Sequence, residues 1–373
     1  MDLSIDASNL LLGGGLKHLQ CLLGNIRTDF FSRVIVYGPA KILEHLPQSS
    51  LIEPREISAK TSNLVYRFRW QTSELGRRLH ADKGVLFVPG GAYLGDYRPF
   101  VTMFRNMQIF ESKELNREGF SKEWIRLRVL QSVQAKTFLN SSGLICISEY
   151  AENYLKQFYP RLLTNTEVRR IPHGISKLRQ TQREYKFDDR IRLLYVSTVK
   201  QYKHQWHLID AVAQLRKEGF PLELHLVGSG DPPALSRMHL AIERHGSLGE
   251  FVYYHGGMSP SDTLEWYELA DLFAYPSSCE NLPNILLEAM ATALPIACSN
   301  RGPMPEVLRD AGVYFNPEQP ASIAASLKVL LQDKVMRQTY GAKARSLSEA
   351  YSWELCAHDT FAFLESVSKR HFS

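Results

Sequence analysis

The sequence YPSSCENLPNILLEAMATALP occupies residues 275–295 and decides the fold. Asn281 is a residue type that caps helices, Pro283 suits a first helical turn, and apolar residues recur at helical spacing from Ile285 onward. The pattern therefore predicts a helix capped by Asn281, directly after a buried strand. The free N–H groups and positive dipole end of such a helix attract anions, so a diphosphate is an expected ligand.

Two glutamates flank the start of this helix. Glu280 comes just before Asn281, and Glu288 lies seven residues beyond it, or roughly 10 Å along a helix axis. One ligand could touch both, with a sugar beside Glu280, phosphates at the helix start and a ribose diol at Glu288. The alternative is that both carboxylates are merely solvated charges.

The two glutamates and the small-residue run EAMATALP, residues 288–295, resemble the E-x7-E signature of family-4 retaining glycosyltransferases. The resemblance implies the α/β fold called GT-B. In that fold two Rossmann-like doubly wound parallel-sheet domains face each other across a cleft, and a C-terminal helix crosses back to the first domain. It also implies that the nucleotide-sugar donor contacts the helix start, at Asn281, Leu282, Asn284, Ile285 and Glu288.

Length and composition agree with two domains. The chain has 373 residues, of which 44% are hydrophobic, enough for two cores. Predicted strands alternate with predicted helices in both halves, as parallel sheets require. We place a first domain at residues 1–175, a second at 176–352 and a returning helix at 353–373. The polar stretch 176–189 reads as the linker between the domains.

Positive charge is concentrated in the first half. Residues 1–180 hold 25 Lys and Arg against 16 Asp and Glu, whereas the remaining residues hold 19 against 23. This charge suits an anionic membrane surface or an anionic acceptor, or it solvates a helix face. Its densest part surrounds the aromatic residues Phe110, Phe120 and Trp124, with Arg105, Lys113, Arg117, Lys122, Arg126, Arg128 and Lys136.

The hydropathy, the first residues and the cysteines of the sequence favour the cytoplasm. No window of about 18 apolar residues occurs, and Met1-Asp2 opens with an acid rather than a basic signal-peptide region. The five cysteines are scattered, so we expect them to be reduced. We expect a cytoplasmic protein, peripheral on the inner face of the membrane if bound there, with no nucleic-acid partner.

A glycine turn, Gly13, Gly14 and Gly15, follows the first predicted strand and precedes a helix. Its backbone N–H groups could approach a phosphate closely, although glycine turns also connect elements for steric reasons. A nicotinamide-dependent oxidoreductase is a rival interpretation, but the GxGxxG spacing is not met. The family resemblance implies that this loop faces the donor diphosphate and the acceptor.

The strand beginning near Pro99 ends in polar residues. In many members of the family that this sequence resembles, a histidine there contacts the transferred sugar, and the aligned residue in this sequence is Asn106, flanked by Arg105. Asn106 can donate and accept hydrogen bonds but cannot shuttle protons. It could instead simply end the strand.

In the second half, Lys203 resembles the family lysine that holds the donor diphosphate. Most relatives place an arginine a few residues earlier, where this sequence has Ser197 and Thr198. The resemblance implies that these two residues also contact the donor, but the second phosphate-binding cation stays unassigned, and Lys200 could supply it. The resemblance also implies that the turns at Gly228 and Met258 lie near the nucleotide, the latter seating its base.

The resemblance implies a retaining hexosyltransferase in cell-surface polysaccharide biosynthesis, with a glycan or lipid-linked acceptor. We predict Glu280, Asn106 and Lys203 as its catalytic residues, acting by positioning and charge stabilisation. Asp-x-Asp is absent from the sequence, so we expect no metal and no other cofactor. The alternative is a non-catalytic subunit that binds a nucleotide sugar on the same fold.

Overall fold

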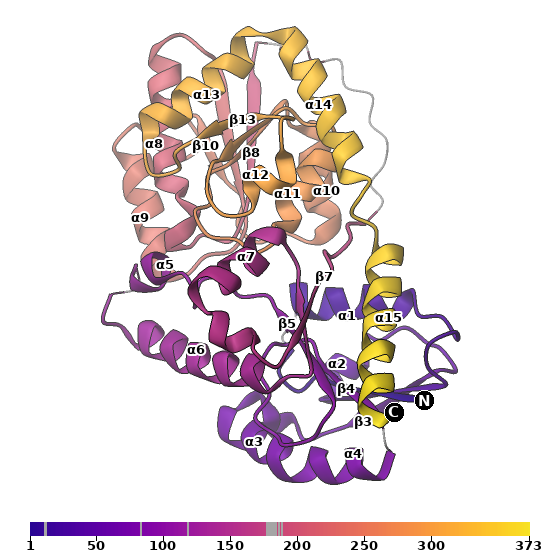
Figure 1. Cartoon of the computed structure of the whole chain (residues 1–373). Coiled ribbons are helices and arrows are strands. Elements are labelled where there is room, and N and C mark those ends of the chain that lie inside the picture. The colour runs from indigo at the N-terminus through magenta and orange to yellow at the C-terminus, as the bar shows by residue number, and fades with distance from the viewer. Residues whose placement is uncertain (11–12, 83, 118, 177–184, 186, 188) are drawn as a thin grey trace. The chain divides into compact units, whose positions relative to one another are not determined.

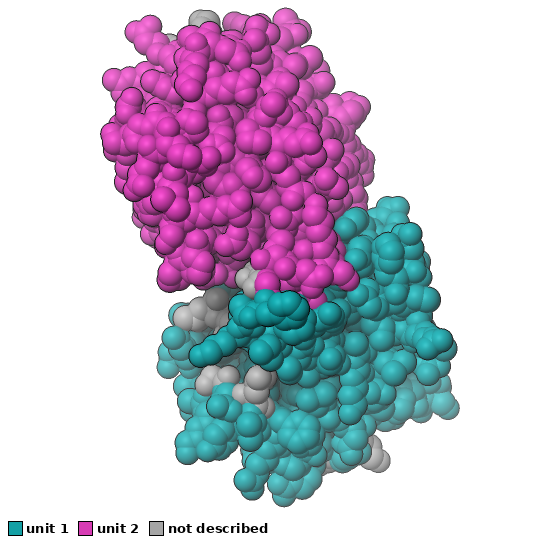
Figure 2. All heavy atoms as spheres, turned by 90° about the vertical axis from the view of Figure 1, so that its left-hand side faces the viewer, with its two compact units in different colours: residues 1–110, 120–174, 351–373 teal, residues 111–119, 175–350 magenta. Residues whose placement is uncertain are grey.

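The computed structural model describes residues 1–10, 13–82, 84–117, 119–176, 185, 187 and 189–373 (Figure 1). The chain divides into two compact units (Figure 2). Unit 1 comprises residues 1–110, 120–174 and 351–373, and unit 2 comprises residues 111–119 and 175–350. Most of the predicted linker, 176–189, lies outside the described residues.

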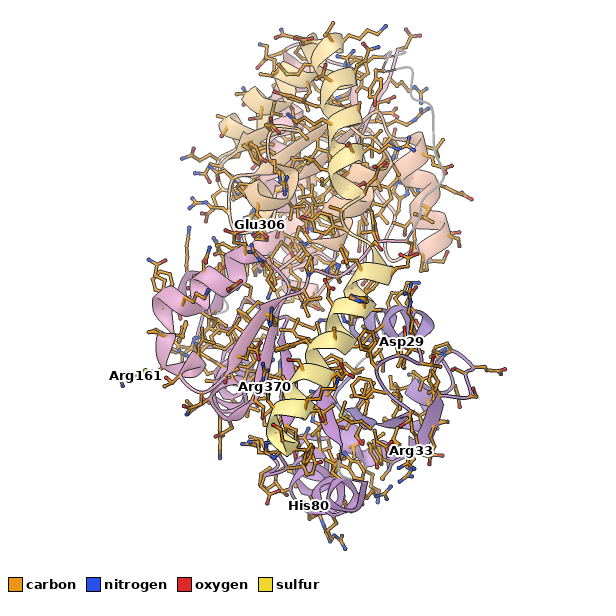
Figure 3. All side chains as sticks on the ribbon, turned by 45° about the vertical axis from the view of Figure 1, so that its right-hand side comes forward. Asp29, Arg33, His80, Arg161, Glu306 and Arg370 are labelled. Carbon is orange, nitrogen blue, oxygen red and sulfur yellow. The ribbon has the colours of Figure 1, made fainter. Side chains whose placement is uncertain are left out.

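Unit 1 is built on a seven-stranded parallel sheet with the order β3-β2-β1-β4-β5-β6-β7. Its strands are β1 (Asp2–Asp6), β2 (Arg33–Gly38), β3 (Ile52–Glu56), β4 (Val85–Val88), β5 (Phe100–Phe104), β6 (Gly143–Cys146) and β7 (Glu167–Arg170). The inner strands β4, β5 and β6 are buried along their whole length, as expected for a parallel sheet covered on both faces. At one edge, Arg33 bonds Asp2 at 2.5 Å and Glu53 at 3.5 Å, which ties β2 to both of its neighbours (Figure 3).

The helices of unit 1 follow the predicted alternation. They are α1 (Gly14–Gly24), α2 (Ala40–Leu43), α3 (Leu64–Arg69), α4 (Gly76–Asp82), α6 (Lys122–Asn140), α7 (Glu149–Phe158) and α15 (Trp353–Phe372), with 3₁₀ turns at η1 (Ala59–Ser62) and η3 (Pro160–Leu163). A π-helical segment, η2 (Trp70–Leu75), joins α3 to α4. Ser148 caps α7 by accepting a hydrogen bond from Ala151 N. The terminal helix α15 packs against α1, which confirms the prediction that it returns to the first domain.

Unit 2 is a six-stranded parallel sheet with the order β10-β9-β8-β11-β12-β13. Its strands are β8 (Ile191–Val196), β9 (Leu222–Val227), β10 (Val252–Tyr254), β11 (Leu272–Tyr275), β12 (Ile296–Ser299) and β13 (Val313–Phe315). Its helices are α8 (Gln205–Lys217), α9 (Pro232–Glu243), α10 (Pro260–Leu269), α11 (Asn284–Ala291), α12 (Met304–Leu308), α13 (Pro320–Gln332) and α14 (Lys334–Ser348), with a 3₁₀ turn at η4 (Gln201–Lys203).

One short helix belongs to unit 2 although the chain on both sides of it belongs to unit 1. This helix is α5 (Ser112–Asn116), within the inserted segment 111–119. Glu318 of unit 2 bonds Lys113 at 2.6 Å and Arg117 at 2.7 Å. These ion pairs hold the pKa of the Glu318 carboxyl at about 2 despite the opposing effect of burial. Ion pairs thus bind the inserted segment to the rest of unit 2. The chain passes between the two units four times.

Candidate functional site

The strand order of unit 2 reverses between β8 and β11. The chain runs outward from β8 to β9 and β10, and then returns to place β11 on the other side of β8. Ligands of doubly wound sheets bind at the carboxyl ends of the strands at such a reversal. The loop after β8 carries Lys203, and the loop after β11 carries Glu280. The fold therefore brings these two predicted residues together.

Lys203 and Glu280 form a buried ion pair. The Lys203 Nζ atom contacts Glu280 Oε1, and only 8% and 15% of the two side chains are exposed. The Tyr275 hydroxyl donates a hydrogen bond of 2.6 Å to the same carboxylate oxygen. The Lys203 ammonium lies 5.1 and 5.6 Å from the ring centroids of Tyr202 and Tyr275. The site thus holds a partly desolvated cation and an oriented carboxylate, the groups needed to bind a phosphate and a sugar hydroxyl.

The backbone around Lys203 is fixed from two sides. The buried Tyr195 hydroxyl donates to the Lys203 carbonyl at 2.9 Å. The Ser278 N–H donates to the Tyr202 carbonyl at 2.9 Å, and the His204 Nε2 atom lies 3.0 Å from the Ser278 hydroxyl. Burial lowers the pKa of His204 to about 3, so its ring is neutral at pH 7. The loops that carry Lys203 and Glu280 therefore form one bonded framework.

The helix after Glu280 begins later than predicted. α11 starts at Asn284, its N-cap residue is Pro283, and no side chain caps it, so the prediction that Asn281 caps the helix is wrong. The physical reason is the backbone of Pro283, whose ψ of 101° is extended and keeps residues 281–283 outside the helix. The first N–H groups of α11 have no acceptor within the helix. The buried Asn284 Oδ1 atom also has no partner among the described residues.

Glu288 lies four residues into α11, roughly 6 Å along the axis from Asn284. It accepts a hydrogen bond of 3.0 Å from the hydroxyl of Tyr267, a fully buried residue of α10 that also reaches the Ile285 carbonyl at 3.3 Å. Burial and the Glu288 charge raise the pKa of Tyr267 well above its ordinary value, so its hydroxyl stays a donor. Glu288 is therefore oriented by the protein.

The other predicted residues of unit 2 lie at the same edge of the sheet. Gly228 follows β9 with φ of +139°, and a Cβ atom there would lie 2.1 Å from the Ser197 carbonyl oxygen. The loops after β8 and β9 meet at this point because residue 228 is a glycine. Thr198 is exposed and Met258, after β10, is half-buried. Lys200, the other candidate cation, pairs with Asp231 at 3.4 Å.

The predicted residues of unit 1 lie at the carboxyl ends of β1 and β5. α1 begins at Gly14 after Gly13, whose φ is +111°, and no side chain caps it. Arg105, directly after β5, donates from Nη2 to the Gly14 carbonyl at 3.0 Å and is thereby joined to the glycine loop. Asn106 is half-buried and has no hydrogen-bond partner among the described residues. Gly13, Gly14, Gly15 and Asn106 thus share one edge of the unit 1 sheet.

Sequence reasoning missed the two tyrosines that orient the glutamates. Tyr275 ends a strand of otherwise aliphatic and phenyl side chains, and Tyr267 is a buried tyrosine on a helix. A buried tyrosine usually has a partner for its hydroxyl, so both were detectable as polar groups. Their partners were not detectable, because Tyr267 meets Glu288 from a different element.

Among the described residues, no three or more His, Cys, Asp or Glu side chains gather as a set of metal ligands. Over the same residues, every helix is too short or too polar to cross a membrane.

Known proteins resemble this chain most clearly in its second half. Residues 176–347 match the model of the family described as glycosyl transferases group 1. The chain is 25% identical over 270 residues to O-antigen chain mannosyltransferase B of Escherichia coli, covering 70% of this chain and 68% of that protein. It is 33% identical over 168 residues to D-inositol 3-phosphate glycosyltransferase of Salinispora arenicola, covering 43% of this chain and 38% of that protein.

Solved structures resemble the whole chain. Sucrose-phosphate synthase from Thermosynechococcus elongatus matches with a TM-score of 0.75 and 16% identity, covering 96% of this chain and 97% of that one. HepE from Anabaena, solved with UDP and glucose, matches with a TM-score of 0.70 and 18% identity, covering 98% and 100%. Similarity at this level of identity shows the fold. The chain therefore has the GT-B fold, and its residues 176–347 match the glycosyl transferases group 1 family.

Proposed function

We propose that this protein is a retaining hexosyltransferase that moves a sugar from a nucleotide-diphosphate donor to a glycan or lipid-linked acceptor. The observation that carries the proposal is the buried Lys203–Glu280 pair, oriented by Tyr275 at the reversal point of the unit 2 sheet. An ammonium that contacts Glu280, four residues before the uncapped start of α11, suits a diphosphate, and the fixed carboxylate suits sugar hydroxyls.

The proposed reaction breaks the bond between the anomeric carbon and the donor phosphate oxygen and forms a bond to an acceptor hydroxyl on the same face. Lys203 and the first N–H groups of α11 stabilise negative charge on the departing diphosphate, which accepts the proton of the acceptor hydroxyl. Glu280 orients the sugar hydroxyls, and Glu288 binds the ribose diol. The protein contributes mainly position and preorganised charge.

The substrate class rests on the relatives. One is named an O-antigen chain mannosyltransferase, and one fold neighbour was solved with UDP and glucose. A hexose donor and a role in cell-surface polysaccharide biosynthesis fit these names. We also propose that the reaction needs no metal, because Lys203 and the α11 start can carry the diphosphate charge. Loss of transfer in EDTA with recovery in Mg²⁺ or Mn²⁺ would contradict this.

A screen of UDP-, GDP-, ADP- and dTDP-sugars tests the donor assignment, read by thermal shift and by nucleotide release. A nucleotide that binds only the folded state raises the melting temperature by mass action. We expect one nucleotide to give both signals. Absence of binding by all four would overturn the proposed site.

A second candidate is a subunit that binds a nucleotide sugar without turning it over. The observation that favours it is Asn106, which stands where relatives carry a histidine and cannot transfer a proton. Nucleotide binding without release, in the presence of candidate acceptors, would support this alternative.

We further propose that α6 docks on an anionic membrane at the cytoplasmic face. Phe110 is buried, and Lys113 and Arg117 pair with Glu318, so these residues of the predicted basic surface are not available. The docking face of α6 is therefore a smaller set that combines exposed apolar side chains with basic ones. Its members are Phe120, just before α6, Ile125 and Val129, with Lys122, Arg128 and Lys136. Trp124 is half-buried and Arg126 pairs with Glu123 at 2.5 Å, so both are left out.

A further inference from the structure

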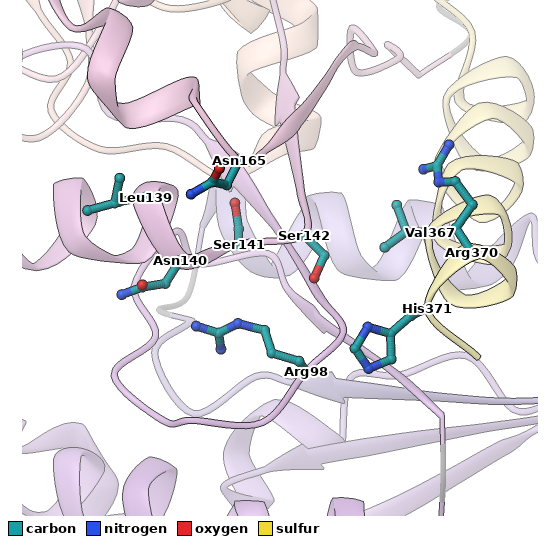
Figure 4. A pocket seen from close by; sticks show the side chains of 9 residues that line it. All are labelled: Arg98, Leu139, Asn140, Ser141, Ser142, Asn165, Val367, Arg370 and His371. Atoms are coloured by element: carbon teal, nitrogen blue, oxygen red, sulfur yellow. The ribbon is translucent and has the colours of Figure 1, made fainter. Parts of the chain in front are cut away.

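A cavity of about 430 Å³ opens in unit 1 at the amino ends of three neighbouring strands (Figure 4). Arg98 precedes β5, Ser142 precedes β6 and Asn165 precedes β7, and the ends of α6 and α15 complete the wall with Asn140 and His371. The carboxyl ends of the same strands point to the opposite edge of the sheet, where Arg105 and Asn106 lie. The cavity is thus separate from the candidate catalytic residues of unit 1.

The wall of the cavity is rich in hydrogen-bond donors and contains no acidic side chain. None of its nine lining residues is Asp or Glu, whereas two are arginines and one is a histidine. Ser142, Asn140 and Asn165 add a hydroxyl and two amides. Leu139 and Val367 supply an apolar part of the wall. Such a mixture suits a small molecule with an anionic head and an organic remainder, and the volume lies in the range of ligand sites.

Most of these donors are unused by the protein. Among the described residues, the side chains of Asn140, Ser142, Asn165 and His371 have no hydrogen-bond partner, and the His371 ring lies 5.0 Å from that of Phe372. Figure 4 shows these side chains around the space that Arg98 enters. Arg370 differs from them, because its guanidinium is bonded to Glu167.

Arg98 is the central group. It donates from Nη1 to the Tyr97 carbonyl at 2.9 Å, stacks its guanidinium 4.6 Å from the centroid of the Phe100 ring, and has no ion pair among the described residues. Burial lowers its pKa, which reflects incomplete solvation of the charge. A half-buried guanidinium that is held in place without a carboxylate is prepared to receive an external anion.

Two of the basic side chains at the cavity can be explained without a ligand. Arg370 and His371 lie in the last turn of α15, where positive charge complements the helix dipole without any ligand. That explanation does not apply to Arg98, Ser142 or Asn165, which lie on loops before strands and come from three separate parts of the chain.

We propose that this cavity binds a phosphate monoester, with Arg98 as the main charged contact and Asn140, Ser142, Asn165 and His371 as further donors. A phosphate fits better than a carboxylate because its three terminal oxygens can accept bonds from several directions, whereas a carboxylate has two oxygens. The phosphate could belong to a soluble metabolite or to a phospholipid headgroup. The proposal does not depend on the proposed function.

The test measures binding by the full chain in two arms. In the first, glycerol 3-phosphate is titrated calorimetrically. In the second, co-sedimentation is measured with phosphatidylcholine vesicles with and without phosphatidic acid. Both measurements are repeated with three variants. These are Arg98→Gln, Ser142→Ala, which removes only a hydroxyl group, and Arg161→Gln. Arg161 is an exposed arginine of the same unit that lies outside the cavity (Figure 3), so it controls for the loss of one surface charge.

We expect glycerol 3-phosphate to bind the wild type and Arg161→Gln alike, at least about tenfold more weakly to Arg98→Gln, and measurably more weakly to Ser142→Ala. If Arg98→Gln weakens only co-sedimentation with phosphatidic acid vesicles, this would also support the site and would assign the phosphate to a lipid. Equal binding by the wild type, Arg98→Gln and Ser142→Ala in both arms would overturn the proposal. A phosphate bound at the carboxyl ends of the strands would give that result, so failure here leaves the nucleotide-sugar site untouched.

Discussion

At the scale of single residues, the Lys203 ammonium and the Glu280 carboxylate neutralise each other's charge. A diphosphate that binds Lys203 competes with the carboxylate, and the carboxylate is then free to accept hydrogen bonds from a sugar. Under the proposed function, the pair therefore has two states, one in which the two groups contact each other and one in which each contacts the donor. Tyr275 stays bonded to Glu280 in the first state and fixes the orientation that the second requires.

Replacing Glu280 with Gln should lower kcat by about 100-fold or more while leaving nucleotide affinity unchanged or improved. The charge that orients the sugar is lost, but Lys203 becomes free for the diphosphate. Steady-state kinetics and nucleotide titration measure the two effects separately. Tyr275→Phe is the matched control, because it removes one donor to the same oxygen and keeps the charge, so its effect should be smaller. A kcat near that of the wild type for Glu280→Gln would remove this residue from the catalytic site.

Part of this site could be predicted from the sequence. Glu280, Glu288 and Lys203 lie on short segments with recognisable local patterns, and the structure brings Lys203 and Glu280 together across 77 residues. The contacts of Tyr275, Tyr267 and Lys200 depend on which strand or helix lies beside them, and this is set by the fold as a whole. Capping by Asn281 was the error, because side-chain preference alone does not reveal that the backbone at Pro283 is extended.

At the scale of elements, aliphatic strands alternating with helices allowed both sheets to be predicted. Buried parallel strands are continuously apolar, and this pattern is local. The inserted α5 segment could not be predicted. Its attachment to unit 2 depends on ion pairs between Lys113, Arg117 and Glu318, which lie about 200 residues apart in the chain.

Gly228 has no side chain, and this allows the loops after β8 and β9 to meet. Gly228→Ala should destabilise the protein by about 3 kcal/mol or more, because the new Cβ would clash with the Ser197 carbonyl in addition to straining the backbone. Gly219→Ala is the control. Its φ is also positive, at +95°, but no atom lies within 4 Å of the Cβ position, so the expected cost is about 1–2 kcal/mol. Urea unfolding compares them, and equal losses would show that the close contact at Ser197 is unimportant.

The buried ring of His204, at the start of α8, should make stability depend on pH. The pKa of this ring is about 3 in the folded chain and about 6.5 in the unfolded chain, so below pH 6.5 the unfolded state binds the proton first. The contribution of His204 to the free energy of unfolding is thus complete above pH 6.5. It falls by about 1.4 kcal/mol per pH unit as the pH drops toward 3.

His204→Asn should make the acid dependence of unfolding less steep between pH 6.5 and pH 4.5. Asn is the suitable replacement because residue 204 has φ of +54°, a left-handed conformation that Asn tolerates. Urea midpoints measured across that range give the slope. His225 is lowered to a pKa of about 4 by burial and remains in the variant, so part of the dependence should persist. An unchanged slope would contradict a neutral, buried His204.

At the scale of the whole molecule, the exposed apolar side chains of α6 should mediate membrane binding. Replacing Ile125 and Val129 with Ser should reduce co-sedimentation with anionic vesicles several-fold, because 58% and 51% of these residues are exposed in the absence of a membrane. Val335→Ser is the control, since Val335 is 71% exposed on α14 in unit 2. Binding that is unaffected by the double substitution, or equally weakened by Val335→Ser, would exclude α6 as the docking face.

The path of the chain through its two units also limits which recombination events can yield a folded protein. Because residues 111–119 are embedded in unit 2 and residues 351–373 in unit 1, neither unit is encoded by one uninterrupted stretch. A single crossover near residue 175 would join a new second unit to the old α5 and α15. The new unit would need its own acid for Lys113 and Arg117 to bond, as Glu318 does now. Recombination between related genes is therefore expected to yield functional hybrids only when the parents share this charge pattern. Substitution within each unit, in contrast, leaves this charge pattern in place.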